Sequence, residues 1–243
     1  VSGECMSAGP KSKLPTRKLK TEVHDLLRNA DFAAAMDRIC QYPYRQVVNP
    51  LFGFLHSLDE TVRWRAISAM GAVVSRLADQ SLESARIVMR RFLWNLNDES
   101  GGIGWGSPEA MGEIMTQSAA LAGEYGNLLV SYIEPGKNFL EHEELQKGLL
   151  WGLGRLARSR PSLVARAAAF LPPFLQSEDR RLRGLSIWAA AALPLDRTEE
   201  LIRKRIDDND SVTIYLEGRF ITHRIGQLAR DALRRTPSDG RRR

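Results

Sequence analysis

The feature that most constrains the fold of this chain is a recurring alternation of a short helical segment, an acidic turn and a longer helical segment. From Leu19 onward, apolar residues recur at the three- and four-residue spacing of amphipathic helices. The acidic turns fall near residues 59, 98, 143, 179 and 210. Self-similarity at roughly 30 to 45 residues is typical of paired-helix repeats that stack on their neighbours. The pattern therefore predicts an all-α fold, with no strand and no hairpin.

The predicted domain organisation is a single all-α superhelix of about five helical-hairpin repeats over residues 19–233. Its first helices are predicted over 50–58, 85–96, 128–133, 163–175 and 199–206, and its second helices over 62–77, 108–124, 144–158, 182–193 and 212–233. Residues 1–18 are rich in Ser, Gly, Pro and Lys, which predicts a disordered basic tail. Residues 234–243 form a second basic tail.

Three of the second helices share a sequence pattern. An acidic residue is followed by an apolar residue, a basic residue, two variable positions and a small residue. The matching segments are Val62-Arg63-Trp64-Arg65-Ala66, Leu145-Gln146-Lys147-Gly148-Leu149 and Leu182-Arg183-Gly184-Leu185-Ser186. This pattern resembles the HEAT repeat, whose paired helices stack into an α-solenoid of the HEAT/armadillo type, and the resemblance covers about residues 31–233. The segment from Leu96 to Gly106, with Pro108 and Glu109, looks like a hallmark of uncharacterised bacterial HEAT-repeat proteins. The resemblance implies a fold and no activity.

Composition excludes several function classes. The net charge is +6, but five cations against Glu4 in residues 1–20, and six arginines against two aspartates in residues 230–243, leave the body slightly acidic. A groove that follows phosphates needs clustered cations on the folded surface, so nucleic acid is not favoured. No apolar run reaches the roughly 20 residues of a membrane span. Two cysteines match no disulfide framework or zinc spacing, and no cofactor is expected. A cytoplasmic protein is the expectation.

In HEAT-like solenoids the second helices line the concave surface, so their non-core faces are where partners usually bind. Helical placement of residues 62–77 predicts a core stripe of Val62, Ala66, Met70, Val73 and Leu77. The same procedure puts Trp64, Trp151 and Trp188 on non-core faces. They are either groove residues that contact a partner or fillers of the seams between repeats, because large aromatic side chains are usually buried.

The stretch from Trp94 to Gly112 interrupts the helical pattern with a glycine-rich loop that carries Trp105. Ser107 is predicted to be the N-cap of the next helix, with Pro108 at its first position. Glycines before a helix start also occur in phosphate-binding loops. However, no strand precedes the loop, and Asp98 and Glu99 would place negative charge beside the anion. A structural turn or the lip of a peptide-binding groove is the preferred interpretation.

Glu109 and Glu113 are spaced to share one face of the helix that follows the loop. Two carboxylates in this arrangement can hold a hard cation or perform acid–base chemistry, or they can simply be a solvated face that complements the helix dipole. The four histidines form no metal or catalytic motif. No catalytic or metal-binding residue is therefore assigned.

The preferred hypothesis is a non-enzymatic scaffold that binds a protein or peptide in its concave groove. Trp105 would anchor the partner, and Glu109 and Glu113 would select a basic segment. The predicted partner-binding residues are Asp98, Glu99, Trp105, Glu109, Glu113, Trp64, Trp151 and Trp188. One alternative is a nucleic-acid-binding enzyme resembling the HEAT-like DNA glycosylases that remove alkylated bases. Another is a small-molecule function similar to that of the phycobilin lyases, which only the expected fold supports.

Overall fold

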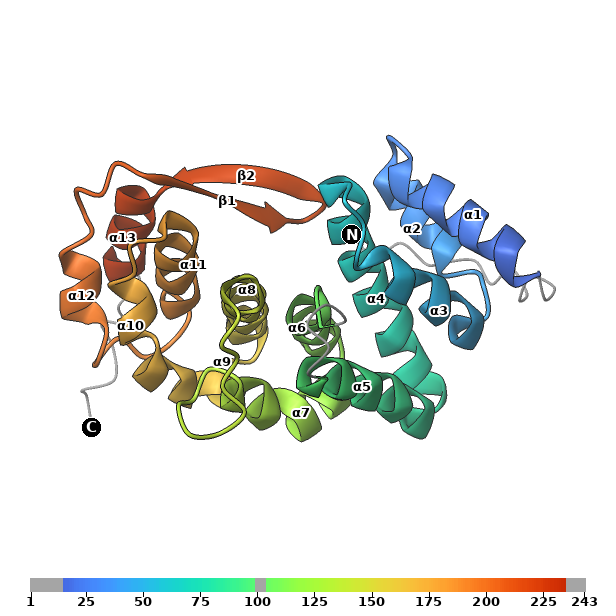
Figure 1. The fold of residues 1–243 in the computed structure, drawn as a ribbon, viewed down its shortest axis with the longest axis horizontal. Helices are drawn as coiled ribbons and strands as arrows, with labels where there is room; N and C mark the ends of the chain where they lie inside the picture. Colours follow the sequence, from blue (N-terminus) through green and yellow to red (C-terminus); the bar gives the residue numbers. More distant parts are fainter. Residues whose placement is uncertain (1–14, 99–103, 235–243) are drawn as a thin grey trace, which may run out of the picture.

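The computed structural model describes residues 15–98 and 104–234, which form an arc of stacked helices bridged on its concave side by a β-hairpin (Figure 1). The inner helices of the arc are α4 (Glu60–Gln80), α6 (Ser107–Gln117), α8 (Glu143–Ser159) and α11 (Arg180–Ala190). The remaining helices are α1 (Thr16–Arg28), α2 (Phe32–Ile39), α3 (Tyr44–Phe54), α5 (Leu82–Asn97), α7 (Ala119–Ser131), α9 (Pro161–Val164), the 3-10 helix η1 (Ala165–Phe170), α10 (Pro172–Leu175), α12 (Glu199–Arg203) and α13 (Ile225–Arg234). The hairpin consists of β1 (Ser211–Leu216) and β2 (Arg219–Arg224). Within the described ranges, no helix is long and apolar enough to cross a membrane.

Two of the five acidic turns, at Asp59 and Asp179, supply the N-caps of inner helices. The Asp59 carboxylate accepts hydrogen bonds from the backbone N–H groups of Thr61 and Val62 at the start of α4, at 2.9 and 3.2 Å. Asp179 does the same for Arg181 and Leu182 at the start of α11, at 2.7 and 2.9 Å. Such caps satisfy backbone donors that have no partner inside the helix. At these two positions the acidic turn marks where an inner helix begins, whereas α6 and α8 begin after Gly106 and His142, and a strand follows the turn at residue 210.

Successive inner helices pack side by side, α4 on α6, α6 on α8 and α8 on α11. The predicted stripe on α4 lies in the core, since all five of its residues are at most 3% exposed. The expectation of a helical solenoid is confirmed. α1 begins at Thr16, inside the stretch predicted as a tail, and residues 1–14 and 235–243 lie outside the described part of the chain.

Two predicted helices are broken. The helix expected over 108–124 ends at Gln117, because Ser118 takes an extended conformation and its side chain caps α7 by accepting from Leu121 N at 3.4 Å. The helix expected over 163–175 is divided into α9, η1 and α10. Pro172 and Pro173 lack the N–H group that a continuous helix would need there.

The helix predicted from Val212 was wrong in its first half, where the structure has the antiparallel pair β1–β2. Glu217 and Gly218 connect the strands with φ values of 49° and 81°. Positive φ at both central residues belongs to the type I′ turn, whose twist matches that of paired strands. The available signal was the β-branched alternation in Val212-Thr213-Ile214 followed by a glycine turn.

The closest approach between inner helices is at Gly112 of α6 and Gly152 of α8. A Cβ atom added at Gly112 would lie 2.4 Å from the Gly152 Cα, and one at Gly152 would lie 2.5 Å from the Pro108 carbonyl oxygen. The contacted atoms are backbone, which cannot move aside as a flexible side chain can. Glycine is therefore required at both positions for α6 and α8 to pack at this distance.

We expect Gly112→Ala to lower the free energy of unfolding by about 3 kcal/mol or more, because the added methyl group forces the two helix backbones apart. Urea denaturation followed by circular dichroism measures the change. Gly123→Ala is the matched control, since this α7 glycine has open space around it and alanine is favoured in helices by about 0.5–1 kcal/mol. Equal effects of the two substitutions would contradict the close packing.

Candidate functional site

Strand β1 lies over the inner helices on the concave side of the arc (Figure 1). The Trp151 indole Nε1–H on α8 donates a hydrogen bond to the Tyr215 carbonyl oxygen at 2.9 Å. Val212 packs on α11 at Gly184, where a Cβ atom would lie 2.5 Å from the valine side chain. At the far end of the hairpin, Gly218 approaches Phe32 of α2. The hairpin therefore covers the floor that a groove-binding partner would otherwise meet.

Under β1 the predicted tryptophans form an aromatic cluster with Tyr215. The Trp64 ring lies 4.8 Å from that of Trp151 and stacks on Tyr215 at 5.2 Å, measured between ring centroids. Trp151 and Tyr215 are each 3% exposed and Trp188 is 5% exposed, while Trp64 is half-buried. Burial of Trp151 and Trp188 agrees with the seam-filling alternative raised for them.

Trp188 lies apart from the groove surface. Its ring packs against Gly154 of α8, where a Cβ atom would come within 2.3 Å of it. The Arg158 guanidinium lies 3.7 Å from the ring centroid and donates to the Trp188 carbonyl oxygen at 2.6 Å. Both contacts occur where α8 meets α11, which makes Trp188 a packing residue.

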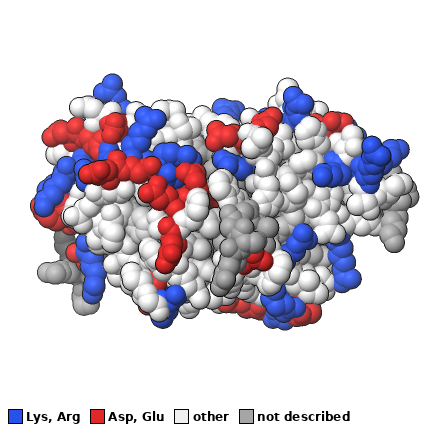
Figure 2. Space-filling view, viewed as in Figure 1, with Lys and Arg blue, Asp and Glu red and all other residues white. Residues whose placement is uncertain are grey.

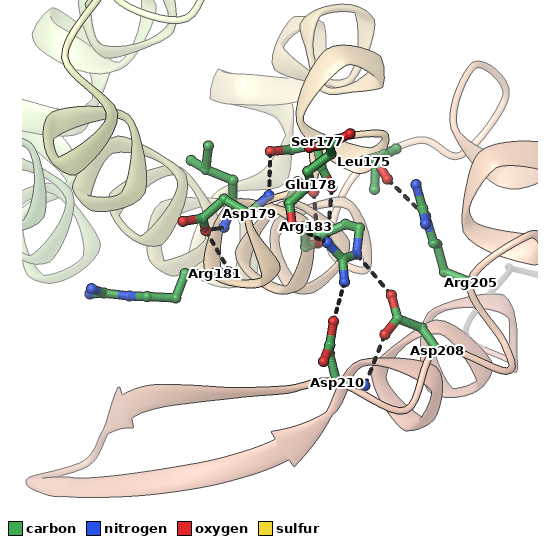
Figure 3. A network of polar contacts seen from close by, with 11 residues as sticks. Leu175, Ser177, Glu178, Asp179, Arg181, Arg183, Arg205, Asp208 and Asp210 are labelled. Atoms are coloured by element: carbon green, nitrogen blue, oxygen red, sulfur yellow. Dashed lines mark hydrogen bonds and ion pairs between the residues drawn. The ribbon is translucent and has the colours of Figure 1, made fainter.

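The base of the hairpin is held by Arg183 of α11 (Figure 3). Its guanidinium donates to Asp208 Oδ2 at 2.8 Å, to Asp210 Oδ2 at 2.6 Å and to the carbonyl oxygens of Ser177 and Glu178 at 2.9 Å each. Burial acts to raise the pKa of Asp208, but the hydrogen bonds from Arg183 and the Asp210 backbone outweigh it and leave this pKa lowered. A planar guanidinium that satisfies two carboxylates sets the direction in which β1 leaves the helical body.

Among the described residues, Trp151 and Tyr215 both line two cavities on the concave side. The tip cavity has a volume of about 620 Å³ and lies beneath the hairpin turn, against α2, α4, α6 and α8. The cap cavity has a volume of about 40 Å³ and lies where α4, α6, α8 and α11 begin. Because the same two aromatic residues line both cavities, their contact forms the partition between them.

Glu113 lies in the wall of the tip cavity and already has partners. Arg155 donates to its two carboxylate oxygens at 2.8 and 3.1 Å, and Gln117 Nε2 donates at 2.9 Å. The Glu113 and Gln117 side chains pack on Gly71, where a Cβ atom would come within 2.7 Å of both. A carboxylate held in this way is a fixed negative group that orients neighbours, and it is a poor general base.

Tyr215 and Ser68 add hydroxyl groups to the tip cavity. Burial raises the pKa of the Tyr215 phenol, which the neighbouring Ser68 hydroxyl and the charge of Arg65 oppose only in part, so the phenol stays protonated at neutral pH. Asp31 and Glu217 are exposed residues that line the same cavity, and Arg219 is a nearby cation. The cavity thus combines an aromatic floor with polar walls and an acidic margin.

Glu109 lines the cap cavity in a different environment. Its Oε2 atom is excluded from solvent and has no hydrogen-bond partner among the described residues. The carboxyl group lies against Gly148, where a Cβ atom would come within 2.4 Å of it. Burial, only partly offset by a hydrogen bond from its own backbone and by the charge of Arg63, raises its pKa to about 7.

The glycine-rich loop contributes Trp105 and Gly106 to the cap cavity. Trp105 is half-buried, and its ring centroid lies 5.7 Å from that of His142. Gly106, with φ of 74°, takes the N-cap position predicted for Ser107, which becomes the first residue of α6. Asp98 is half-buried at the end of α5, and Glu99 lies outside the described residues.

The predicted site residues are therefore divided. Trp64, Trp105, Glu109 and Trp151 meet at the cap cavity, Glu113 and Trp151 at the tip cavity, and Trp188 at neither. Sequence reasoning missed Tyr215, which had been placed on a helix. Across residues 15–98 and 104–234, no cluster of three His, Cys, Asp or Glu side chains could hold a metal ion.

Comparison with known proteins identifies the fold. No family model matches the chain. An uncharacterised protein of Archaeoglobus fulgidus is 30% identical over 107 residues, which are 44% of this chain and 52% of that protein, so the match spans about half of the relative. An engineered protein (TM-score 0.52, 16% identical) aligns with 90% of this chain and 96% of its own. A designed armadillo repeat protein in complex with the peptide (KR)4 (TM-score 0.51, 17% identical) aligns with 90% and 99%. The chain has the fold of a HEAT/armadillo-like repeat solenoid.

We expect Arg183→Gln to release the hairpin, because it leaves Asp208, Asp210 and two carbonyl groups without their donor. The free energy of unfolding should fall by about 2–4 kcal/mol, less than for a fully buried pair because Asp210 is half exposed. Hydrogen exchange should accelerate in residues 211–224. Arg203→Gln is the control, since Arg203 forms an exposed pair with Glu199 on α12. Unchanged exchange in the hairpin would contradict the anchoring role.

Proposed function

We propose that this protein is a non-enzymatic repeat scaffold that binds an extended segment of a protein or peptide partner in the tip cavity. The observation that carries the proposal is the cavity itself, because about 620 Å³ lies within the roughly 300–1,000 Å³ of typical ligand pockets. Trp151 and Tyr215 supply an aromatic floor, and Glu113 and the Tyr215 hydroxyl supply fixed polar groups. The loop that carries Trp105 would border the partner on the other side of β1.

The charge at the margin supports a basic segment in the partner. Asp31 and Glu217 are exposed residues in the lining of the cavity, one before α2 and the other in the hairpin turn. Glu113 is compensated by Arg155, so selection by charge would rest on the two exposed acids more than on the glutamates of α6. The designed armadillo protein of similar fold is in complex with the peptide (KR)4, which supports a peptide as the class of ligand.

Two observations favour a protein partner over nucleic acid. On the face drawn in Figure 2, lysine and arginine side chains are interspersed with aspartate and glutamate, whereas phosphate binding favours clustered cations. Arg65, the cation of α4 that lines the tip cavity, donates to the carbonyl oxygens of Leu27 and Asn29 at 2.9 and 2.7 Å. The Arg65 guanidinium is therefore engaged with the backbone before α2, so it is not placed to bind a phosphate.

We expect the peptide (KR)4 to bind saturably in isothermal titration calorimetry, with an affinity that falls as salt is raised. The double variant Asp31→Asn with Glu217→Gln should bind about 5- to 20-fold more weakly, because two charge-assisted contacts are lost. Asparagine at position 31 keeps the helix cap, so the fold should be preserved.

The matched control is Glu199→Gln with Asp231→Asn, which removes the same charge from α12 and α13. Equal weakening in the two double variants would show that net charge, and not the tip cavity, governs binding. Absence of binding to the wild-type protein would reject a basic peptide as the ligand.

A further inference from the structure

The cap cavity is built from the first turns of four inner helices. Arg63 lies in the first turn of α4, Glu109 in that of α6, Glu144 in that of α8 and Arg181 in that of α11. The backbone N–H groups and the dipoles at helix starts favour negative charge. Four converging starts make this small space more attractive to an anion than a single helix end.

Three residues that line this cavity have a buried polar atom without a hydrogen-bond partner among the described residues. The atoms are Nε of Arg63, which can only donate, Oε2 of Glu109 and the hydroxyl oxygen of Tyr215. Buried polar groups without partners are uncommon in folded proteins and cost free energy. Gly148 provides the space in which the Glu109 carboxyl lies, so the arrangement is specified by the sequence of α8 as well as by that of α6.

The charged groups around Glu109 come from each element that lines the cavity. α4 contributes Arg63, α8 contributes Glu144 and Lys147, α11 contributes Arg181, and β1 contributes the neutral Tyr215. Lys147 Nζ lies 2.8 Å from Glu144 Oε1 and 3.0 Å from Asp179 Oδ2. Arg181 Nη1 lies 3.7 Å from Glu144 Oε2. Lys147 and Arg181 are therefore paired with carboxylates, and Arg63 Nη2 lies 3.2 Å from Glu60 Oε1, so the buried cationic donor without a partner is Arg63 Nε–H.

We propose that the cap cavity binds a carboxylate group. One carboxylate oxygen of the ligand accepts a hydrogen bond from Arg63 Nε–H, and the other accepts from the O–H of protonated Glu109. The ligand thereby supplies the acceptor that Arg63 lacks and gives the Glu109 carboxyl a partner. A cationic head group could not accept these hydrogen bonds, which separates this site from the proposed basic-peptide site at the tip cavity.

The size of the cavity limits what enters it. A water molecule needs roughly 10–15 Å³ measured in the same way, so about 40 Å³ admits a group of a few atoms, such as a carboxylate head. The planar group would lie among the rings of Trp64, Trp105 and Trp151. The rest of the ligand would remain outside, which allows the carboxylate to belong to a small acid or to the end of a peptide chain.

Binding is linked to the proton on Glu109. The carboxyl can donate only in its protonated form, and its pKa of about 7 leaves it largely protonated at pH 6 and largely ionised at pH 8. The apparent affinity for a carboxylate should therefore fall by about tenfold between pH 6 and pH 8, in proportion to the competent fraction. Glu109→Gln places a permanent N–H donor at this position and should remove the pH dependence.

The test is a titration with sodium acetate, followed through the tryptophan indole N–H signals in ¹⁵N-edited NMR spectra. We expect saturable shifts of the Trp64 and Trp105 signals, with no shift for Trp94, which is 64% exposed on α5 and serves as an internal control. Glu109→Gln should bind acetate equally well at pH 6 and pH 8, whereas the surface control Glu83→Gln should keep the wild-type pH dependence. Gly148→Ala should abolish binding, with retained circular dichroism showing that the protein is folded.

A peptide with a free C-terminus and its C-terminal amide distinguish the sources of the carboxylate. Binding of acetate together with the free peptide, but not the amide, would indicate a chain end; binding of acetate alone would indicate a small acid. No saturable shift with either probe would overturn the proposal, as would an unchanged pH dependence in Glu109→Gln. Neither result would bear on (KR)4 binding at the tip cavity.

Discussion

The backbone contact between Gly112 of α6 and Gly152 of α8 sets the spacing on which the concave side depends. Because these helices meet without intervening side chains, residues within one turn of the contact reach across the interface. Glu113 of α6 meets Arg155 of α8, and Glu109 lies on Gly148. Wider spacing would separate the ion pair and open the niche that excludes the Glu109 carboxyl from solvent. Close helix packing and site geometry are therefore consequences of the same two glycines.

The hairpin is the second determinant, because it converts an open groove into two cavities. Without β1, Trp64 and Trp151 would present aromatic surface to solvent, and large aromatic side chains bury roughly 150–250 Å² each. Tyr215 covers them and accepts the Trp151 hydrogen bond, while Arg183 fixes the base of the hairpin. The solenoid thus uses one of its own segments to cover the middle of its concave surface, and leaves access at the two margins.

Glu109 and Glu113 show how neighbouring turns of one helix can hold the same side chain in opposite states. Glu113 is compensated by a bidentate arginine and by Gln117. Glu109 has no such partner, and its burial raises its pKa to about 7. The first arrangement suits a permanent structural charge, and the second suits a group whose proton is exchanged on binding. The tip cavity is assigned a basic ligand because Asp31 and Glu217 are exposed in its lining, and the cap cavity is assigned a carboxylate because Arg63 Nε–H and protonated Glu109 can donate to one.

The sequence by itself determined the solenoid and the N-caps of α4 and α11, because helical periodicity and capping by Asp59 or Asp179 depend on residues within four positions of one another. The tertiary structure alone decided the hairpin, the burial of Trp151 and Trp188, and the division of the site. These depend on contacts between distant residues, such as Trp151 with Tyr215 or Val212 with Gly184. The sequence located Glu109 and Glu113 on one helix face, but only the packing of α8 decided which of them found a partner.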